Sequence, residues 1–460
     1  MVITVVYCDL LYALDVVYLV DLLILLLFIL DLDWFNVSEP ISFAKQLKGK
    51  VVLLDFFTYC CINCLHILPH LKRFEEKYPI QDGLVIVGVH SAKFTNEKDS
   101  TNVHAAIKRH QIDHPVVNDL NNSMWHKLQI QCWPTMLIVG PGGKPLFVIM
   151  GESHNTITEK FIKASLEFYS AVGQLHLEKI INWYSNDPFK PANLKPSKIE
   201  SPTNLKYPGK IQCLKYNLSD VNFPEIYAMS DSGNNRIIIF DAQGMVLHKI
   251  GRTGAGGFVN GSFDKAAFNF PQGVAFVDEN ILIVADSDNN AVRKINLKEK
   301  TVETIIGTGK QGTDFHGGAI GNIQDISTPW DVVVYKTKNM DMSFHVDDSE
   351  VEQKNVLLIA MAGTHQIWAY FMEKTIWWRY RKLEGTQCVA IAGSGEERNR
   401  NNNYPHQASF AQPSGLALLR DSNALIVADS ESSSIRKMAL SDGKVSAIVG
   451  GNSNPMVIYK

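Results

Sequence analysis

Cysteine is scarce in this chain of 460 residues, and its seven copies are unevenly spaced. Secreted disulfide frameworks are dense in cysteine, so this composition favours a reducing, cytoplasmic setting. Net charge is small as well: the value of -3 leaves no basic footprint for nucleic acid or for an anionic membrane. The hydrophobic content of 46% is ordinary for a globular protein, and the length predicts two or three domains.

Positive charge is absent from the first 33 residues, which contain no Lys or Arg. A secretory signal peptide carries such charges ahead of its apolar stretch. The longest uncharged run here, 22–30, has nine residues, whereas roughly 20 are needed to span a membrane. We interpret residues 1–33 as an atypical apolar extension or a gene-model artefact. A membrane anchor or an uncleaved signal is the alternative.

Two cysteines with Cys-x-x-Cys spacing, Cys61 and Cys64, follow the apolar strand-like run 51–54 and precede a helical pattern. Unpaired amides and the dipole at a helix N-terminus favour the thiolate, the form that attacks a disulfide. Cys61 is therefore the predicted nucleophile and the exposed thiol of the pair. One helical turn later on the same face, Cys64 is the predicted resolving thiol, and we expect it to be shielded.

Four further sequence features accompany the cysteine pair. Asp55 lies six residues before Cys61, Pro69 lies five after Cys64, and Trp133-Pro134-Thr135 follows about 70 residues later. A Gly-Gly-Lys turn at 142–144 follows the predicted strand 136–139. A Cys-x-x-Cys pair alone is weak evidence, but in this setting it resembles the thioredoxin-like family.

The resemblance assigns roles to several residues. It implies that Asp55 is a buried carboxylate that helps to move the proton of Cys64. It also implies that Pro134 is a cis-proline beside the disulfide and that the Trp133 backbone pairs with an extended substrate peptide. Cys60 stands where the family usually has Trp, and we count it as a second substrate contact. No cofactor beyond the dithiol Cys61-Cys64 and no metal is expected.

Simpler interpretations remain open for each residue. A zinc ion could have two cysteine and two histidine ligands here. Only one residue separates the two pairs, however, whereas zinc sites of this kind have a loop of roughly twelve residues between them. Asp55 could be a strand-end cap. Cys60 and Cys132 could be small core residues, the usual fate of free cysteine. Trp133 could be a packing residue. The four zinc candidates are Cys61, Cys64, His66 and His70.

The order of elements predicts an α/β thioredoxin-like domain over 34–184. Its expected elements are an amphipathic helix over 41–47, strands over 84–90 and 114–119, helices over 97–110 and around Trp125, and a closing helix over 156–183. A stretch rich in Pro, Asn and Ser, 185–204, is the predicted linker.

Internal repetition marks the rest of the chain, 205–460. The segment 228–237 recurs at 284–292 and at 427–437, and a degenerate copy falls between the last two. Each copy offers several short strands with turn signals, which is typical of propeller blades. The Asp of each copy is predicted to cap a turn, and Ala362 stands in its place in the third copy.

These blades resemble NHL repeats, and a Cys-Cys-Ile-Asn-Cys centre joined to such blades resembles an NHL-repeat family. The resemblance implies a six-bladed propeller and a further β-rich domain, whereas this sequence supplies about four blades. We therefore expect a multidomain protein: an α/β thioredoxin-like domain followed by an all-β, incomplete NHL-type propeller.

The predicted function is a cytoplasmic thiol-disulfide oxidoreductase module tethered to a propeller that binds a protein partner or substrate, without nucleic acid or membrane. A non-catalytic interaction scaffold with a vestigial dithiol is the alternative. The peroxidase branch of the fold lacks its Pro/Thr and Arg peroxide site here. Because Ile62-Asn63 replaces the common Gly-Pro, the redox direction stays open.

Overall fold

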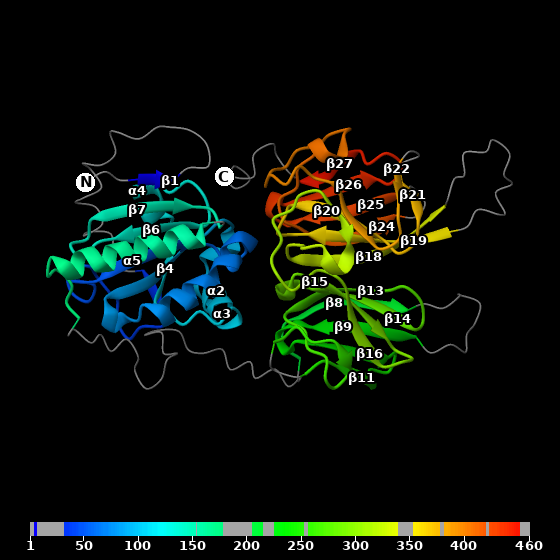
Figure 1. Ribbon diagram of the computed structural model, residues 1–460, viewed down its shortest axis with the longest axis horizontal. Coiled ribbons are helices and arrows are strands. Elements are labelled where there is room, and N and C mark those ends of the chain that lie inside the picture. Colours follow the sequence, from blue (N-terminus) through cyan, green and yellow to red (C-terminus); the bar gives the residue numbers. More distant parts are fainter. Residues whose placement is uncertain are drawn as a thin grey trace. The chain divides into compact units, whose positions relative to one another are not determined.

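The computed structural model describes residues 4–6, 32–152, 154–177, 205–214, 225–252, 256–338, 353–377, 381–419 and 423–450. The chain divides into two compact units, one before and one after the boundary between Ile199 and Glu200. The first unit is α/β and the second is all-β (Figure 1). The predicted linker over 185–204 lies outside the described residues.

A seven-stranded mixed sheet forms the centre of the first unit, in the order β1-β7-β6-β3-β4-β5-β2. The central strand β3 pairs in parallel with β4 and antiparallel with β6. All seven of its residues are buried, as expected of an apolar run covered on both faces. The strands are β1 (Thr4–Val6), β2 (Asp33–Phe35), β3 (Val51–Phe57), β4 (Leu84–Ser91), β5 (Val116–Asp119), β6 (Thr135–Val139) and β7 (Pro145–Met150).

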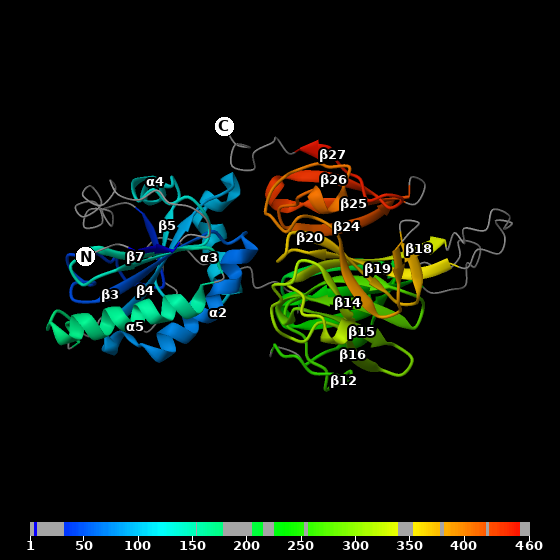
Figure 2. The ribbon, with the colours of Figure 1, turned by 45° about the horizontal axis from the view of Figure 1, so that its top comes forward.

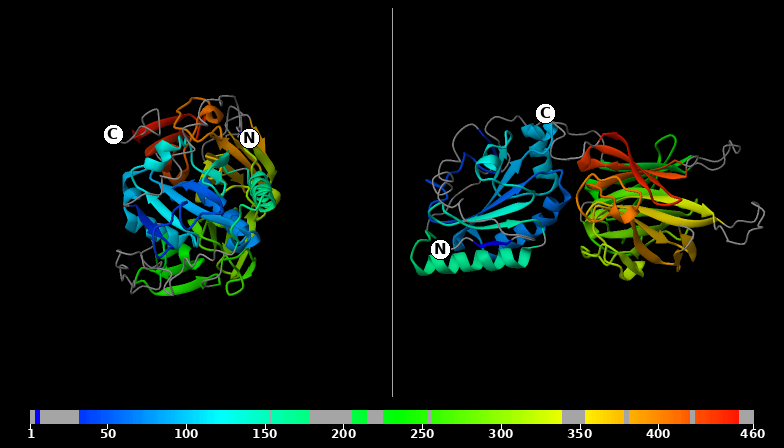
Figure 3. Two further views of the ribbon diagram at one scale, coloured as in Figure 1. Left: turned by 90° about the vertical axis from the view of Figure 1, so that its left-hand side faces the viewer. Right: turned by 90° about the horizontal axis from the view of Figure 1, so that it is seen from above.

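Helices cover both faces of this sheet (Figure 2). Val51 and Leu53 of β3 pack against α2 and α5, and α5 runs along the sheet as a long rod in Figure 3. The alternate residues Val52 and Leu54 point to the opposite face, where α4 packs. The helices are α2 (Ile62–Lys77), α3 (Ser100–Arg109), α4 (Ser123–Lys127) and α5 (Asn155–Ala171).

The predicted amphipathic helix over 41–47 is wrong, because the chain forms a series of turns there. The Ser42 carbonyl accepts from the amides of Lys45 at 3.3 Å and Leu47 at 3.0 Å, which are spacings of three and five residues rather than the four of an α-helix. The apolar residues Ile41, Phe43 and Leu47 are nevertheless buried in the core. The apolar spacing therefore predicted burial correctly but not the backbone conformation.

The predicted extension over 1–33 contributes to the sheet at both of its ends. β1 pairs in parallel with β7 as an edge strand, and Asp33 begins β2, which pairs with β5. Residues 7–31 lie outside the described part of the chain. Within the described ranges, no helix has both the length and the apolarity needed to cross a membrane.

The second unit contains four antiparallel sheets of four or five strands, the blades of a β-propeller, which follow one another from green to red in Figure 1. Their innermost strands β8, β13, β18 and β24 pack together in chain order. Blade one is β8 (Pro208–Leu214), β9 (Ile226–Asp231), β10 (Arg236–Asp241) and β11 (Val246–Ile250). Blade two is β12 (Gly261–Ser262), β13 (Pro271–Phe276), β14 (Ile281–Asp286), β15 (Ala291–Asn296) and β16 (Thr301–Ile306).

The degenerate third copy also forms a blade, as the sequence predicts. Blade three is β17 (Gly317–Ile320), β18 (Pro329–Lys338), β19 (Gln353–Met361), β20 (Gln366–Phe371) and β23 (Gln387–Ala392). A separate pair, β21 (Thr375–Trp377) and β22 (Arg381–Leu383), lies between β20 and β23 in the sequence. Blade four is β24 (Pro413–Leu419), β25 (Ala424–Asp429), β26 (Ser434–Ala439) and β27 (Val445–Gly450).

One face of blade four is uncovered. In blade two, Val292 and Ile306 lie opposite each other on adjacent strands, and both are 0% exposed. In blade four, Ile435 and Val449 form the corresponding pair, and they are 38% and 65% exposed. Positions that join one blade to the next in blade two therefore face outward in blade four.

Candidate functional site

The two cysteines of the predicted redox pair lie at the start of α2. Cys61 is the N-cap residue, and its carbonyl accepts hydrogen bonds from the amides of Cys64 and Leu65 at 3.1 and 3.2 Å. Both cysteines are free thiols. This places Cys61 where the orphan amides and the dipole of the helix act on its sulfur.

The prediction that Cys61 is exposed is wrong, since it is only 2% exposed and Cys64 only 1%. Both pack in an apolar cluster with Phe57, and Tyr59 and Trp133 pack against the same cluster. The more accessible thiol is Cys60, which is half-buried. The helix-start position predicted the electrostatic setting of Cys61, but the aromatic side chains around it, two from just before it in the chain and Trp133 from a distant loop, bury it.

Cys64 is the stronger case of burial. Desolvation, together with a hydrogen bond and charge repulsion from Cys61 and then the charge of Asp55, raises the pKa of the Cys64 thiol well above its usual value. A thiol in that setting stays protonated until a base removes its proton. The arrangement matches the predicted shielded, resolving cysteine, and it makes a nearby proton acceptor necessary for any attack by Cys64.

Asp55 occupies the centre of β3, where it pairs in register with Gly88 of β4 and Met136 of β6. Its carboxyl group is 1% exposed, and neither oxygen has a hydrogen-bond partner among the described residues. Burial raises the pKa of Asp55 to about 7, and the charge of His114 opposes this rise. Because neither carboxyl oxygen accepts a hydrogen bond from the described residues, Asp55 does not act as a strand-end cap.

The loop before β6 carries the predicted cis-proline. The peptide bond between Trp133 and Pro134 is cis. The indole of Trp133 stacks on Trp125 with ring centroids 4.1 Å apart, and the Lys93 ammonium lies 5.7 Å from its ring centroid. Trp133 thus packs against the core and also borders the cysteine cluster, so packing and substrate contact are compatible for this residue.

A residue that the sequence did not single out, Glu97, holds the loop of the cysteine motif. Its carboxylate is fully buried and accepts hydrogen bonds from the Thr58 hydroxyl at 2.5 Å and the Cys60 amide at 3.3 Å. Its other oxygen accepts from the amides of Lys93 and Phe94, both at 2.9 Å. No local sequence signal identifies this contact, because Glu97 lies 39 residues from Thr58.

The zinc ligands considered for the motif are held in other ways. Cys61 and Cys64 lie in the apolar cluster, whereas the imidazole of His66 is hydrogen-bonded to the Glu152 carboxylate. Burial lowers the pKa of His70. In the part of the chain that the structure describes, no group of three or more His, Cys, Asp or Glu side chains is arranged to hold a metal ion.

The repeated Asp of the propeller is a buried anchor rather than a turn cap. Asp286 precedes a short 3-10 helix, η4 (Ser287–Asn289), but its side chain makes no capping bond there. Its carboxylate instead accepts from the Asn269 amide, the Asn289 amide group and the Arg293 guanidinium, each at 2.8 Å. The predicted turn-capping role is therefore wrong, because no backbone amide of the turn is bonded to the carboxylate. The donors are a side chain of the turn, a loop amide and an arginine of β15.

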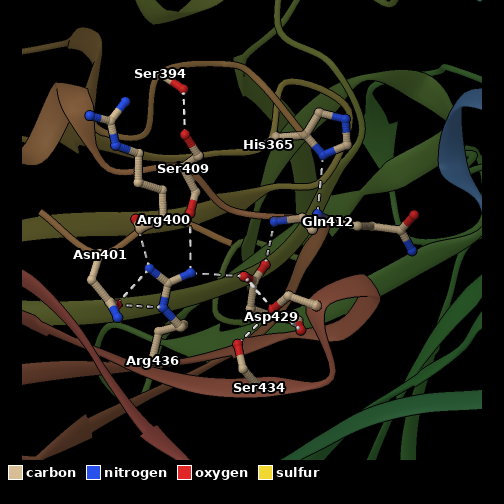
Figure 4. Close-up of polar contacts among 11 residues, drawn as sticks. His365, Ser394, Arg400, Asn401, Ser409, Gln412, Asp429, Ser434 and Arg436 are labelled. Carbon is tan, nitrogen blue, oxygen red and sulfur yellow. Dashed lines mark hydrogen bonds and ion pairs between the residues drawn. The ribbon is translucent and has the colours of Figure 1, made fainter. Parts of the chain in front are cut away.

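The same anchor recurs in blade four (Figure 4). There Asp429 accepts from the Ala411 amide at 2.7 Å and from Arg436 at 3.1 Å, and Arg436 also contacts Asn401. Blade three lacks the pair altogether. The strand register places Met361 opposite Gln366, where blade two has Asp286 opposite Ala291. Met361, and not Ala362, therefore replaces the repeated Asp.

Consecutive blades are joined by a second recurring contact, which we call the blade junction. The residue after each short turn has positive φ, and its side chain accepts a hydrogen bond from a backbone amide that precedes the next inner strand. The junction pairs are Asn235 with the Phe270 amide at 2.8 Å, Asn290 with the Thr328 amide at 2.8 Å, and His365 with the Gln412 amide at 3.1 Å (Figure 4).

A cavity of about 460 Å³ lies where the four inner strands meet. Asp331 of β18 spans it: one oxygen accepts from Lys210 of β8 at 2.7 Å and the other from the Leu416 amide of β24 at 2.8 Å. The cavity extends over Ile426 and Ile435 of blade four, on the face that is uncovered. Most of the lining is apolar or glycine, and its two charged side chains, Lys210 and Asp331, form an ion pair with each other.

Comparison with known proteins agrees with this architecture. Residues 49–145 match the thioredoxin-like family, and 268–295 and 410–438 match the NHL repeat. NHL repeat-containing protein 2 of Bos taurus is 45% identical over 431 residues, which are 93% of this chain and 55% of that protein. Protein SUPPRESSOR OF QUENCHING 1, chloroplastic, of Arabidopsis thaliana is 40% identical over 432 residues, 92% of this chain and 36% of that protein.

A third relative covers the first unit alone. Thiol-disulfide oxidoreductase ResA of Bacillus subtilis (strain 168) is 28% identical over 118 residues, which are 26% of this chain and 60% of that protein. The chain spans about half the length of the NHL repeat-containing relative, given the 55% covered. The chain thus joins a thioredoxin-like domain to NHL repeats, and over most of its length it is similar to NHL repeat-containing protein 2.

Proposed function

We propose that the thioredoxin-like domain is a thiol-disulfide oxidoreductase that works with Cys61 and Cys64 and needs no further cofactor. The observation that carries this proposal is the buried, unpartnered Asp55 carboxyl beside Cys64, with its pKa raised to about 7. An acid-base group is most effective when its pKa lies near the working pH. A purely structural carboxylate would instead have hydrogen-bond donors around it.

The reaction has two steps. The Cys61 thiolate attacks a substrate disulfide, so that a mixed disulfide forms and one substrate sulfur leaves as a thiolate. The Cys64 thiol then gives its proton to Asp55, and the resulting thiolate attacks the Cys61 sulfur. The Cys61-Cys64 disulfide forms and the second substrate thiolate leaves. The dithiol thereby loses two electrons, the substrate disulfide gains them, and the reverse sequence oxidises a substrate dithiol.

Substrate contacts are proposed for the loop around Pro134 and for Cys60. Trp133 and Tyr59 border the cluster that contains Cys61, so an extended peptide that lies along the Trp133 backbone would displace their rings and reach the sulfur. We assign the second unit to binding of a protein partner or substrate, and we place the protein in the cytoplasm because its few cysteines suit a reducing setting. The name of the ResA relative, a thiol-disulfide oxidoreductase, supports the chemistry.

A second function, an interaction scaffold with a vestigial dithiol, is favoured by one observation. Cys61 is 2% exposed, and a nucleophile that no substrate can reach would not turn over. The two functions differ in what they require of the thiols, since a scaffold gains nothing from reversible oxidation.

A redox titration of the full chain separates the two functions. Equilibration in glutathione buffers of graded potential, followed by alkylation and peptide mass spectrometry, should reveal a Cys61-Cys64 disulfide that forms in one two-electron transition. Cys61→Ser and Cys64→Ser should each abolish this transition, and Cys388→Ser, which changes a buried cysteine of blade three, should leave it intact. If no Cys61-Cys64 disulfide forms at any potential, the scaffold function is correct.

A further inference from the structure

Asp55 can accept a proton from Cys64, but its position in the sheet gives that proton no direct exit to water. β3 is central, with β4 on one side and β6 on the other, and all seven of its residues are buried. Each turnover must return Asp55 to the carboxylate form before it can act again. A second group that reaches both Asp55 and the surface is therefore required.

His114 has the position that this role requires. It precedes β5 and is only 4% exposed. Its Nε2 atom is buried without a hydrogen-bond partner among the described residues, and its Nδ1 atom lies 3.6 Å from the Glu75 carboxylate of α2. The Glu75 side chain is 33% exposed, so the imidazole has one nitrogen in the core and the other beside an acid that touches solvent.

Gly88 gives His114 its access to Asp55. This glycine pairs in register with Asp55 across β3 and β4. A Cβ atom at this position would lie 3.5 Å from His114 Nε2 and 3.0 Å from the ring of Phe57. The missing side chain thus leaves the space in which Nε2 lies near the strand position next to Asp55. A buried, unpartnered imidazole nitrogen therefore lies beside the strand position that pairs with the buried, unpartnered Asp55.

The other titratable groups near this pair are few. Cys61 and Cys64 approach from the start of α2, and Glu75 approaches from its last turns. Lys72 and Asp113 pair with each other at 3.9 Å on the surface beside them.

A second buried imidazole, His90 of β4, also lies near Asp55 and His114: its ring contacts that of Phe57, and its Nδ1 atom is hydrogen-bonded to Asn118 at 3.1 Å. Burial lowers the pKa of His90. Of the two imidazoles, His114 is the one whose charge acts on Asp55 and whose other nitrogen lies beside Glu75.

We propose that His114 carries the proton of Cys64 onward from Asp55 to Glu75 and to water. This inference rests on the proposed oxidoreductase function. After Cys64 has given its proton to Asp55, His114 accepts that proton at Nε2, directly or through one water, and releases the proton of Nδ1 to Glu75. Asp55 returns to the carboxylate. His114 returns to its starting tautomer when the Cys61-Cys64 disulfide is reduced again, because a proton then follows the same path inward from Glu75 through His114 and Asp55 to Cys64.

The charge of His114 acts in the same direction. It opposes the effect of burial on the pKa of Asp55, so it also favours the carboxylate that must accept the next proton. Two effects of removing His114 can therefore be distinguished. Loss of the charge alone would move the pH midpoint of the resolving step upward, and loss of proton transfer would lower the rate even above that midpoint.

The test measures the resolving step in the full chain with glutathione disulfide as the probe. Rapid acid quench and peptide mass spectrometry distinguish the mixed disulfide on Cys61 from the Cys61-Cys64 disulfide, between pH 6 and 9. In His114→Gln the rate at the high-pH plateau should fall by at least about ten-fold, a smaller loss than the ~100-fold lower end for a group that takes the proton directly. Glu75→Gln, at a half-exposed position, should give a smaller loss with no effect on folding.

His104→Gln is the matched control, because His104 stacks on Phe35 and belongs to α3. It should leave the plateau unchanged. A plateau that is unaltered in both His114→Gln and Glu75→Gln, or a His114→Gln profile that only shifts along the pH axis, overturns the relay while the oxidoreductase function stands. If the wild-type protein forms the mixed disulfide but never resolves it, both proposals are wrong.

Discussion

Two buried aspartates, one in each unit, show how differently the same side chain can be used. Asp55 and Asp286 are both almost completely inaccessible, and burial raises the pKa of both, to about 7 and about 6. Asp286 accepts hydrogen bonds from three donors, one of them the Arg293 guanidinium. Asp55 accepts none among the described residues.

The difference separates an anchor from a reactive group. A buried carboxylate with donors on both oxygens holds neighbouring strands together, and changing its protonation would break those bonds. A buried carboxyl without donors costs stability and joins no strands, yet its proton can come and go without breaking a hydrogen bond. The propeller therefore uses Asp to fix geometry, and the thioredoxin-like domain keeps an Asp that is free to titrate.

The largest effect should come from breaking the anchor. Arg293→Met leaves the Asp286 carboxylate buried without its cation, which costs about 3–5 kcal/mol of unfolding free energy for such pairs. Hydrogen exchange of β14 and β15 peptides, read by mass spectrometry, measures this loss within the second unit. Arg252→Met, at an exposed position, should change the free energy by less than about 0.5 kcal/mol. A similarly small loss for Arg293→Met would mean that the pair is not an anchor.

The stability of the first unit should depend on pH through Asp55. Its folded pKa of about 7 lies above the ordinary carboxyl pKa of 3.8, so the folded state binds an extra proton at pH values between the two. The stabilisation is complete below pH 4 and is lost as the pH rises to about 7, by up to about 4 kcal/mol at ~1.4 kcal/mol per pH unit. Asp55→Asn should remove this decline, measured by hydrogen exchange of β3 peptides from pH 4 to 8.

A parallel decline in the Asp55→Asn variant would assign the pH dependence to another group. The buried His110 is a useful check, since burial lowers its pKa to about 4. A histidine with a depressed folded pKa destabilises the protein at acid pH, and this is the opposite sign. His110→Gln should therefore leave the loss between pH 4 and 7 in place.

The chemical step should respond to Asp55 as well. Asp55→Asn should slow resolution of the mixed disulfide by about 100-fold, the lower end of general-base effects, with little change in its formation by Cys61. Rapid quench with glutathione disulfide measures both steps. Equal slowing of both steps would point to a disturbed fold, and no slowing of either would make Asp55 a structural residue.

The smallest of these effects concerns the two ends of the blade series. Ile306→Thr places a hydroxyl in a buried interface and should cost about 2 kcal/mol. Val449→Thr changes the corresponding position of blade four, which is 65% exposed, and should stay within about 0.5 kcal/mol. Hydrogen exchange of β16 and β27 peptides, measured in the full chain at rising temperature, compares the stability costs of the two substitutions. Equal costs would mean that another surface covers blade four.

Sequence reasoning succeeded where the signal is local. The spacing of Asp55, Cys61 and Cys64 predicted one strand, one helix start and their meeting in the first unit, because a strand followed by a helix fixes these positions within a few residues. The repeats likewise predicted four blades, including the degenerate one. Short-range periodicity needs no knowledge of distant contacts.

It failed where distant segments decide the outcome. The exposure of Cys61 depends on the packing of Trp133, and the neighbours of Asp55 depend on the register that brings Gly88 beside it. Glu97 reaches the cysteine loop from 39 residues away. The substitution of Met361 for the repeated Asp could not be aligned without the strand pairing. None of these contacts has a signature that a single sequence reveals.

The blade junction has a consequence for how such chains change in length. At every junction the donor is a backbone amide, offered by residues as unlike as Phe270, Thr328 and Gln412, and any residue other than proline has one. The acceptor side is contributed wholly by the preceding blade. A duplicated repeat would therefore be accepted by its neighbour without matching mutations, and gene duplication could lengthen the array one blade at a time.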